Sequence, residues 1–224
     1  MLSKAQSKHI RSLTQQKFRK EHHQFIAEGH KVALEYLNRT ASIATIVATN
    51  DWVHENIKAI SKHPGAQLML AEQHEIDNIS ALQTPGPVLL VVSYPKETAL
   101  MAQKHWYLAL DDIQDPGNMG TLIRIADWFG VQEIVCSAGC VDIYNPKVIQ
   151  AAMGSHLRVR VHTAILTDAL PTLGIPIYAA TLQGTNIYQI QPEPADAGVI
   201  VIGNESKGIS QAVTNIATHQ ITIP

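Results

Sequence analysis

Two apolar segments of the sequence each stop at a polar, glycine-containing loop and then continue as a helical pattern. The first covers residues 108–130 and the second covers residues 200–208. In α/β proteins, a strand that ends at such a loop and restarts as a helix places ligand-contacting backbone at the carboxyl end of the sheet. Two such loops in one domain predict a single shared site.

The chain of 224 residues, with 46% apolar and 16% charged residues, is long enough for two modest globular domains. In the first half, short apolar runs over residues 43–48, 67–70 and 88–92 alternate with helical patterns over residues 25–37 and 51–61. This alternation predicts a small α/β domain, and a polar stretch after Ser93 places the domain boundary near residue 100. We therefore expect domains over residues 1–100 and 101–224.

The second domain repeats strand and helix patterns. Strands are expected over residues 106–110, 133–136, 175–181 and 199–202, and helices over residues 121–130, 146–153 and 208–218. The strands are almost continuously apolar, as expected when helices cover both faces of a sheet. The predicted fold class is α/β with a mostly parallel sheet.

Positive charge is concentrated at the start of the chain. Residues 1–31 hold seven lysines and arginines against two glutamates and so carry +5, whereas the formal charge of the whole chain is −2. Local clustering of cations, rather than net charge, governs affinity for phosphate. The cluster indicates a face that contacts nucleic acid, and a solvated helix face is the alternative.

Other classes of site and location find little support in the sequence. Cys136 and Cys140 lack a second Cys/His pair at zinc spacing and are too few for a disulfide scaffold, so we expect two inert thiols and no metal. His22 and His23 have no carboxylate or cysteine at ligand spacing. With neither an apolar run of about 18 residues nor a secretory signal, a cytoplasmic protein without a membrane span is expected.

The glycine loop over residues 203–208 does not match the common nucleotide motifs. Ile209 stands where a phosphate-binding P-loop requires lysine, and no G-x-G-x-x-G opens either helix. Hydrolysis of ATP or GTP and binding of a nicotinamide dinucleotide are therefore not expected. Exposed backbone and glycine remain, and they suit an adenosine in a loop cleft.

The two loops together carry a recognisable pattern. Asp115-Pro-x-Asn118-x-Gly120-x-x-x-Arg124, followed by Gly203-Asn204-Glu205-x-x-Gly208, resembles the first two motifs of the SpoU (TrmH-like) RNA ribose methyltransferases of the SPOUT superfamily. The resemblance spans roughly residues 105–224. The segments Asp142-Ile-Tyr-Asn-Pro-Lys147 and Gln150-Ala-Ala-Met-Gly-Ser155 look like the connecting segment of that family.

The resemblance implies methylation of a ribose 2′-hydroxyl in rRNA or tRNA by a homodimer that uses S-adenosylmethionine. It also implies a deep C-terminal trefoil knot around the cofactor, a departure from the usual absence of threading. The implied catalytic residues are Asn118, Arg124 and Glu205. The implied cofactor-binding residues are Thr181, Leu182, Ile202, Gly203, Asn204, Gly208, Ile221 and Ile223.

Arg124 is the central candidate for the chemistry. The resemblance makes it the base, but a guanidinium with a pKa above about 12 is a poor proton acceptor. We expect it to position the target phosphate and ribose. Each candidate also has a structural alternative: Asn118 as a turn residue, Arg124 as a surface cation and Glu205 as a first-turn carboxylate.

The N-terminal domain looks like the substrate-binding domain of many family members, which is related to a ribosomal-protein-like RNA-binding fold. The similarity rests on residues 10–13, 17–20 and 25–31. It implies that Arg11, Lys17, Arg19 and Lys20 contact RNA phosphates.

Two alternative functions remain open at this stage. Family members continue beyond the Ile-Pro that corresponds to Ile223-Pro224 into a third motif, Ser-x-Asn, and we expect an omitted tail rather than a truncated protein. A chain that truly lacks this motif would be a non-catalytic RNA-binding module. Related knotted enzymes that methylate a base provide the other alternative.

Overall fold

The computed structural model describes residues 2–190 and 197–224. The chain forms two compact units: the first contains Met1–Glu97 and Asp142–Leu157, and the second contains Thr98–Val141 and Arg158–Pro224. The segment over residues 142–157, expected in the second domain, thus packs with the first unit. As a statement about functional domains, the division near residue 100 remains a prediction.

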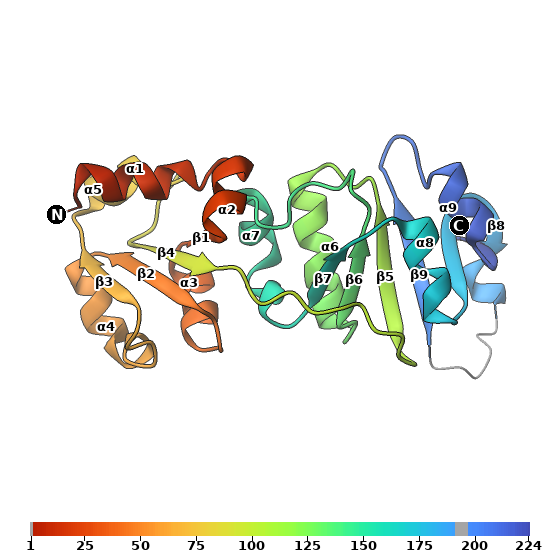
Figure 1. Ribbon diagram of the computed structural model, residues 1–224, viewed down its shortest axis with the longest axis horizontal. Helices are drawn as coiled ribbons and strands as arrows, with labels where there is room; N and C mark the ends of the chain where they lie inside the picture. The colour runs from red at the N-terminus through yellow and green to blue at the C-terminus, as the bar shows by residue number, and fades with distance from the viewer. Residues whose placement is uncertain (1, 191–196) are drawn as a thin grey trace. The chain divides into compact units, whose positions relative to one another are not determined.

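The first unit is built around a four-stranded mixed sheet in the order β1-β4-β2-β3 (Figure 1). β4 runs antiparallel to β1 and to β2, and β2 runs parallel to β3. The strands are β1 (Gln24–Glu28), β2 (Ile43–Ala48), β3 (Gln67–Leu70) and β4 (Val88–Ser93). The helices are α1 (Lys4–Ser12), α2 (Gln16–His22), α3 (His30–Leu37), α4 (Asn50–Ile60), α5 (Gln73–Ile79), α7 (Pro146–Ala152) and the 3-10 helix η1 (Ser155–Leu157).

Strands β2, β3 and β4 and helix α4 lie where the sequence predicts them, but the helix expected over residues 25–37 is wrong in its first part. Phe25, Ile26 and Ala27 form β1 and are all buried. Gly29, with φ +85°, separates β1 from α3. β1 is an edge strand of the sheet, yet it carries buried apolar residues on both faces, and such a run mimics the start of a helical stripe, which explains the error.

Residues 142–157 are held to the first unit by an ion pair and by ring stacking. Arg19 donates from Nε to Asp142 Oδ2 at 2.9 Å, and its side chain is only 2% exposed. The ring of Tyr144 stacks on Tyr94 and Phe25, with centroid distances of 4.1 and 4.8 Å. These contacts anchor the segment over its first residues.

The second unit contains a six-stranded sheet in the order β10-β8-β9-β5-β6-β7, in which every neighbouring pair is parallel. This confirms the expected α/β fold with a parallel sheet. The strands are β5 (Trp106–Asp111), β6 (Glu133–Cys136), β7 (Arg160–Thr163), β8 (Ile177–Asn186), β9 (Gly198–Gly203) and β10 (His219–Thr222). The helices are α6 (Pro116–Trp128), α8 (Leu166–Ala169), α9 (Gln211–Ile216) and the 3-10 helices η2 (Pro171–Leu173) and η3 (Ile187–Gln189).

The order of the strands identifies where a ligand can bind. α6 connects β5 to β6, whereas α8 and η2 connect β7 to β8 in the opposite direction along the sheet. Right-handed crossovers therefore place α6 on one face and α8 on the other. The chain leaves the neighbouring strands β5 and β9 in opposite directions, and such a switch point opens a crevice at the carboxyl ends of the strands.

No helix in residues 2–190 or 197–224 combines the length and apolar character that a membrane span needs.

Candidate active site

The loop after β5 is shaped by helix capping. The side chain of Asp115 caps α6 by accepting the backbone N–H of Asn118 at 2.8 Å, and Pro116 occupies the first helical turn. Proline at this position costs no hydrogen bond because its missing N–H would have no partner within the helix. The cap fixes Asn118 in the first turn, at the carboxyl end of β5.

The loop after β9 folds back on itself. Asn204 and Gly208 exchange both backbone hydrogen bonds, at 3.0 and 2.9 Å. A Cβ on Gly203 would lie 2.3 Å from the carbonyl carbon of Gly208, so no other residue fits there without a backbone shift. The side-chain oxygen of Asn204 accepts the N–H groups of Ser206 and Lys207, which stiffens the tip that carries Glu205.

The two loops meet at the switch point between β5 and β9. Asn118 donates from Nδ2 to Glu205 Oε1 at 2.6 Å. Asn204 donates from Nδ2 to the carbonyl of Asp112 at 2.8 Å, and the buried carboxylate of Asp111 accepts the N–H of Ser210 at 2.8 Å. The expected meeting of the two loops is therefore present, and it pairs Asn118 with Glu205, a contact that the sequence did not predict.

Arg124 lies apart from this pair. It is exposed, and no hydrogen bond or ion pair joins it to another residue in the described part of the chain. It lies six positions after Asn118 along α6, which corresponds to roughly 9 Å of rise.

The residues expected at the cofactor lie around the ends of β8, β9 and β10. The β8–β9 ladder ends at the pair Ala179–Val201, so Thr181 follows at the same edge as Gly203. Pairing of β10 with β8 jumps from Ala179 to Thr185, which leaves the intervening residues as a bulge. Ile202 is half-buried at the end of β9, whereas Ile221 is buried in β10.

This edge carries an unpaired polar atom and exposed apolar side chains. The hydroxyl oxygen of Thr181 is buried and has no hydrogen-bond partner among the described residues. The apolar side chains of Leu182 and Ile223 are 98% and 73% exposed. An unpaired hydroxyl, exposed apolar surface and the backbone of the glycine loop suit the ribose, base and aliphatic chain of S-adenosylmethionine.

A hollow of about 480 Å³ lies beside the same bulge but is lined by other residues. They are Gln183, Gly184, Thr185, Ile190, Ala217, Thr218, His219 and Gln220. None of them belongs to the expected cofactor set.

The structure adds residues to which the sequence gave no role. Asp112 is in the left-handed region with φ +60°, and its N–H donates to Ser137 Oγ at 2.9 Å. A Cβ on Gly139 would lie 2.3 Å from Asp112 Oδ1. The loop after β6 thus supports the loop after β5, and positive φ at a residue other than glycine often marks a functional site.

The cations expected to contact RNA divide into two groups. Arg11, Lys17 and Lys20 are exposed on α1 and α2. Arg19 is buried, with its guanidinium bonded to Asp142 and to the carbonyls of Leu13 and Thr14. Its geometry is that of a structural anchor.

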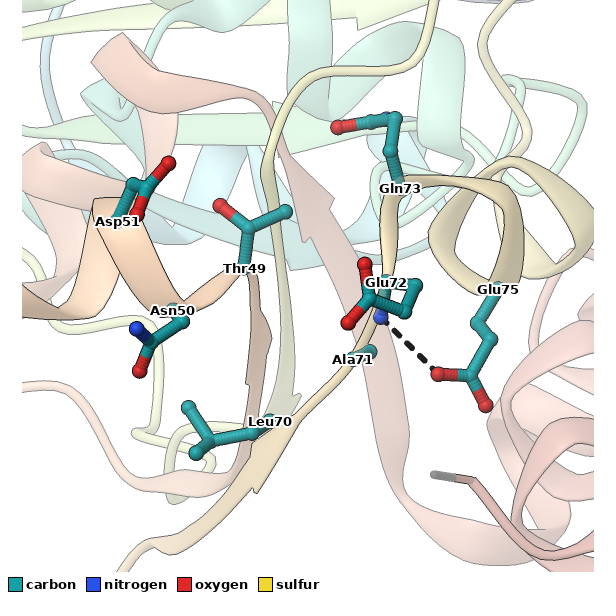
Figure 2. Close-up of a pocket in the computed structure, with 8 residues that line it drawn as sticks. All are labelled: Thr49, Asn50, Asp51, Leu70, Ala71, Glu72, Gln73 and Glu75. Carbon is teal, nitrogen blue, oxygen red and sulfur yellow. Dashed lines mark hydrogen bonds between the residues drawn. The ribbon is translucent and has the colours of Figure 1, made fainter.

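The first unit has a hollow of its own, of about 680 Å³, at the carboxyl ends of β2 and β3. It is lined by Thr49, Asn50, Asp51, Leu70, Ala71, Glu72, Gln73 and Glu75. Figure 2 shows the carboxylate of Glu75 turned back to the backbone N–H of Glu72, a bond of 3.0 Å. With three carboxylates in its lining, this hollow repels phosphate.

Within the described residues, no group of three or more His, Cys, Asp or Glu side chains is arranged to hold a metal ion.

Comparison with known sequences decides the family. The sequence profile of the SpoU rRNA Methylase family matches residues 105–224, which include both loops. The chain belongs to the SpoU rRNA methylase family. A second profile, the MRM3-like substrate binding domain, matches residues 4–90.

Solved structures of SpoU-type proteins have the same fold. A protein from Porphyromonas gingivalis, assigned to the TrmH family of RNA methyltransferases, is 34% identical with a TM-score of 0.90, covering 100% of this chain and 89% of that one. An AdoMet-bound rRNA methyltransferase from Sinorhizobium meliloti is 26% identical with a TM-score of 0.88, covering 100% and 87%.

Two curated SpoU relatives carry functional names. The 23S rRNA (guanosine(2553)-2′-O)-methyltransferase RlmP of Bacillus subtilis is 28% identical over 89% of this chain and 79% of its own length. The mitochondrial rRNA methyltransferase 3 of Xenopus laevis is 30% identical over 74% of this chain but only 41% of its own length.

Proposed function

We propose that this protein transfers a methyl group from S-adenosylmethionine to a ribose 2′-hydroxyl of rRNA. The observation that carries the proposal is the hydrogen bond between Asn118 and Glu205, which joins the two family motifs at the switch point of the sheet. The names of the relatives in Bacillus and Xenopus give the substrate class.

The cofactor supplies an electrophilic methyl group on a sulfonium. The residues of the chain then have to place the ribose oxygen in line with that methyl group and assist loss of the hydroxyl proton. Arg124, exposed and without a partner in the described residues, positions the phosphate and ribose. Glu205, oriented by Asn118, directs the guanidinium or the substrate hydroxyl.

The cofactor is held by the glycine loop and the edge beside it. We assign Thr181, Leu182, Ile202, Gly203, Gly208 and Ile223 to the cofactor. Ile221 is buried and supports it from beneath, and Asn204 acts through the loop because its side chain already bonds Asp112, Ser206 and Lys207. The deep trefoil knot implied by the family is part of this proposal.

The first unit also binds the RNA, through Arg11, Lys17 and Lys20. Arg19 is left out because its guanidinium is buried. Neutralising the three exposed cations should lower the slope of log K against log salt by about 2 to 3, since each phosphate contact contributes about 0.7 to 0.9. Neutralising Arg39, Lys58 and Lys62 is the matched control, and an equal effect of both sets would remove α1 and α2 from the interface.

A homodimer is the expected assembly. At the C-terminal end of α6 the side chains of Ile125, Trp128 and the capping residue Phe129 are 45%, 82% and 76% exposed, at positions spaced to share one helix face. Large apolar side chains gathered on one face mark an interaction surface. Sedimentation should give a dimer that Trp128→Asp converts to a monomer, whereas a monomeric wild-type chain would contradict this assembly.

We place the protein in the cytoplasm, where its RNA is available.

The function is tested with S-adenosylmethionine that carries a labelled methyl group and three substrates: purified rRNA, tRNA and assembled ribosomal subunits. We expect transfer to rRNA, free or assembled, and none to tRNA. Binding of rRNA without transfer of label, while calorimetry shows no binding of S-adenosylmethionine, would overturn the proposal in favour of a non-catalytic RNA-binding module.

A further inference from the structure

The loop that follows β6 carries two cysteines, one on each side of a tight turn. Cys136 ends β6 and is 2% exposed, whereas Cys140 is partly exposed. The N–H of Cys140 donates to the carbonyl of Ser137 at 3.1 Å, which closes the turn. The turn thus carries the two cysteines on its two sides, and Cys140 Sγ lies 3.8 Å from the hydroxyl of Ser137, the neighbour of Cys136 in the chain.

This loop is fastened to the start of the candidate site. The thiol of Cys140 donates to the carbonyl of Leu110 at 3.3 Å, and the N–H of Val141 donates to the carbonyl of Ile113 at 2.8 Å. Residues 110 and 113 flank Asp112, whose carbonyl receives the side chain of Asn204. The position of the cysteine loop is therefore linked to the loop that carries Glu205.

The two thiols differ in character. The pKa of Cys140 is lowered to about 7, chiefly by a hydrogen bond from the thiol of Cys136. Burial acts in the opposite direction and raises this pKa. The N–H groups of Ile113 and Asp112 and the hydroxyl of Ser137 lower it further. The same hydrogen bond, together with burial, raises the pKa of Cys136 well above its ordinary value. Cys140 has the character of a nucleophile and Cys136 that of a resolving thiol.

We propose that Cys140 and Cys136 are a modification site for peroxides, at which oxidation closes a disulfide and displaces the loop that supports Asp112. In the first step the sulfur of Cys140 attacks one peroxide oxygen; hydrogen peroxide is reduced, one water leaves and Cys140 becomes a sulfenic acid. In the second step the thiol of Cys136 attacks that sulfur, a second water leaves and the disulfide forms.

The disulfide has a direct consequence for the site. It removes the thiol hydrogen that Cys140 donates to Leu110 and pulls the turn toward β6. Gly139 packs so closely on Asp112 that a displaced turn has to move this carboxylate. Methyl transfer by the oxidised chain should fall roughly tenfold or more, because small misplacements of site groups carry large kinetic costs.

The chemistry is tested by mass spectrometry without reference to activity. Both cysteines lie in one tryptic peptide, residues 125–147, between Arg124 and Lys147. After graded hydrogen peroxide, this peptide should lose the mass of two hydrogen atoms in the wild type. The variant Cys136→Ser should instead accumulate a sulfenic acid that dimedone captures at Cys140, and Cys140→Ser should do neither.

Two further measurements use the wild type alone, so they do not depend on the stability of a variant. The first tests the reactivity of the cysteines, and the second tests the link between oxidation and the site. In the wild type, iodoacetamide should alkylate Cys140 with a midpoint near pH 7, while Cys136 stays protected until unfolding. Oxidation should slow methyl transfer, and dithiothreitol should restore it. An unoxidised peptide, preferential alkylation of Cys136 or full activity of the disulfide form would each overturn the proposal.

Discussion

At the scale of single residues, the division of labour between Arg124 and the Asn118–Glu205 pair is the main feature of the site. The pair is held by a hydrogen bond of 2.6 Å, whereas Arg124 is exposed and unbonded within the described residues. A preformed pair and a separate, unbonded cation fit the proposed role of Arg124, in which the guanidinium receives a charged substrate group.

Replacing Arg124 by alanine should abolish measurable methyl transfer, a loss of about 100-fold or more. The change should leave the melting temperature and the affinity for S-adenosylmethionine close to those of the wild type, because the side chain is exposed and adds nothing to the core. Single-turnover transfer and calorimetry measure the two effects. Retained transfer would remove Arg124 from the site.

Asn118 and Glu205 should behave as one unit. The variants Asn118→Ala and Glu205→Ala should each lower kcat/KM, and the double variant should lose less than the combined single losses by about 1 kcal/mol, because both remove the same hydrogen bond. Gln211→Ala, which breaks a hydrogen bond to Asn215 on α9, is the control and should change kcat/KM little. Strictly additive losses would contradict a shared role.

The sequence predicted these residues because their chemistry is local to two motifs. Contacts between residues far apart in the sequence could not be predicted. In the sequence Arg19 looks like one more cation in a basic stretch, but in the structure it is buried and pairs with Asp142, 123 positions later. Asp112 could not have been singled out, because its left-handed backbone and its contact with Gly139 exist only in the folded chain. Cys140 was expected to be inert, whereas its surroundings lower its pKa to about 7 through the thiol of Cys136.

At the scale of elements, strands β5, β6, β8 and β9 of the second unit were predictable because buried parallel strands are continuous apolar runs. β1 was missed, since three buried residues followed by a helical stripe look like one helix. β7 and β10 were not expected, because each has only four residues and a single apolar side chain, Val161 in β7 and Ile221 in β10. Parallel pairing with β6 holds β7 in the sheet, and parallel pairing with β8 holds β10.

The turn after β9 depends on the absence of a side chain at Gly203. Gly203→Ala should destabilise the second unit by more than about 3 kcal/mol, because the new Cβ meets backbone rather than a side chain that could rotate away. Gly174→Ala is the matched control: its surroundings are open and only φ +65° opposes the change, so about 1 kcal/mol is expected. Urea unfolding compares them, and equal losses would refute the close-approach explanation.

At the scale of the whole molecule, the chain passes from the second unit into the first and back through residues 142–157. His156, within this segment, is partly buried; its Nδ1 is enclosed without a hydrogen-bond partner among the described residues, and its Nε2 bonds the carbonyl of Ile143 at 2.9 Å. Burial lowers the pKa of His156 to about 4, against the partly compensating carbonyl of Ile143 and charge of Asp142. The segment is therefore packed around a neutral histidine.

This histidine makes the first unit sensitive to acid. Between pH 6.5 and about 4, His156 is protonated in the unfolded chain but neutral in the folded chain. The contribution of His156 to the free energy of unfolding is therefore fully present above this window and is lost as the pH falls through it. From pH 7 to 5 the loss should be about 2 kcal/mol. The variant His156→Gln cannot titrate, so its free energy of unfolding should fall less than that of the wild type by this amount. Urea unfolding at pH 7 and pH 5 measures the difference, and the same pH dependence in variant and wild type would contradict the role of His156.

The central claim is that the two loops of the second unit methylate a ribose oxygen, and the atom that receives the methyl group tests it most directly. After reaction with S-adenosylmethionine carrying a deuterated methyl group, rRNA is digested to nucleosides and analysed by fragmentation in the mass spectrometer. The account predicts the heavy methyl group on the ribose fragment, with none in the Arg124→Ala reaction. A heavy methyl group on the base fragment would contradict it.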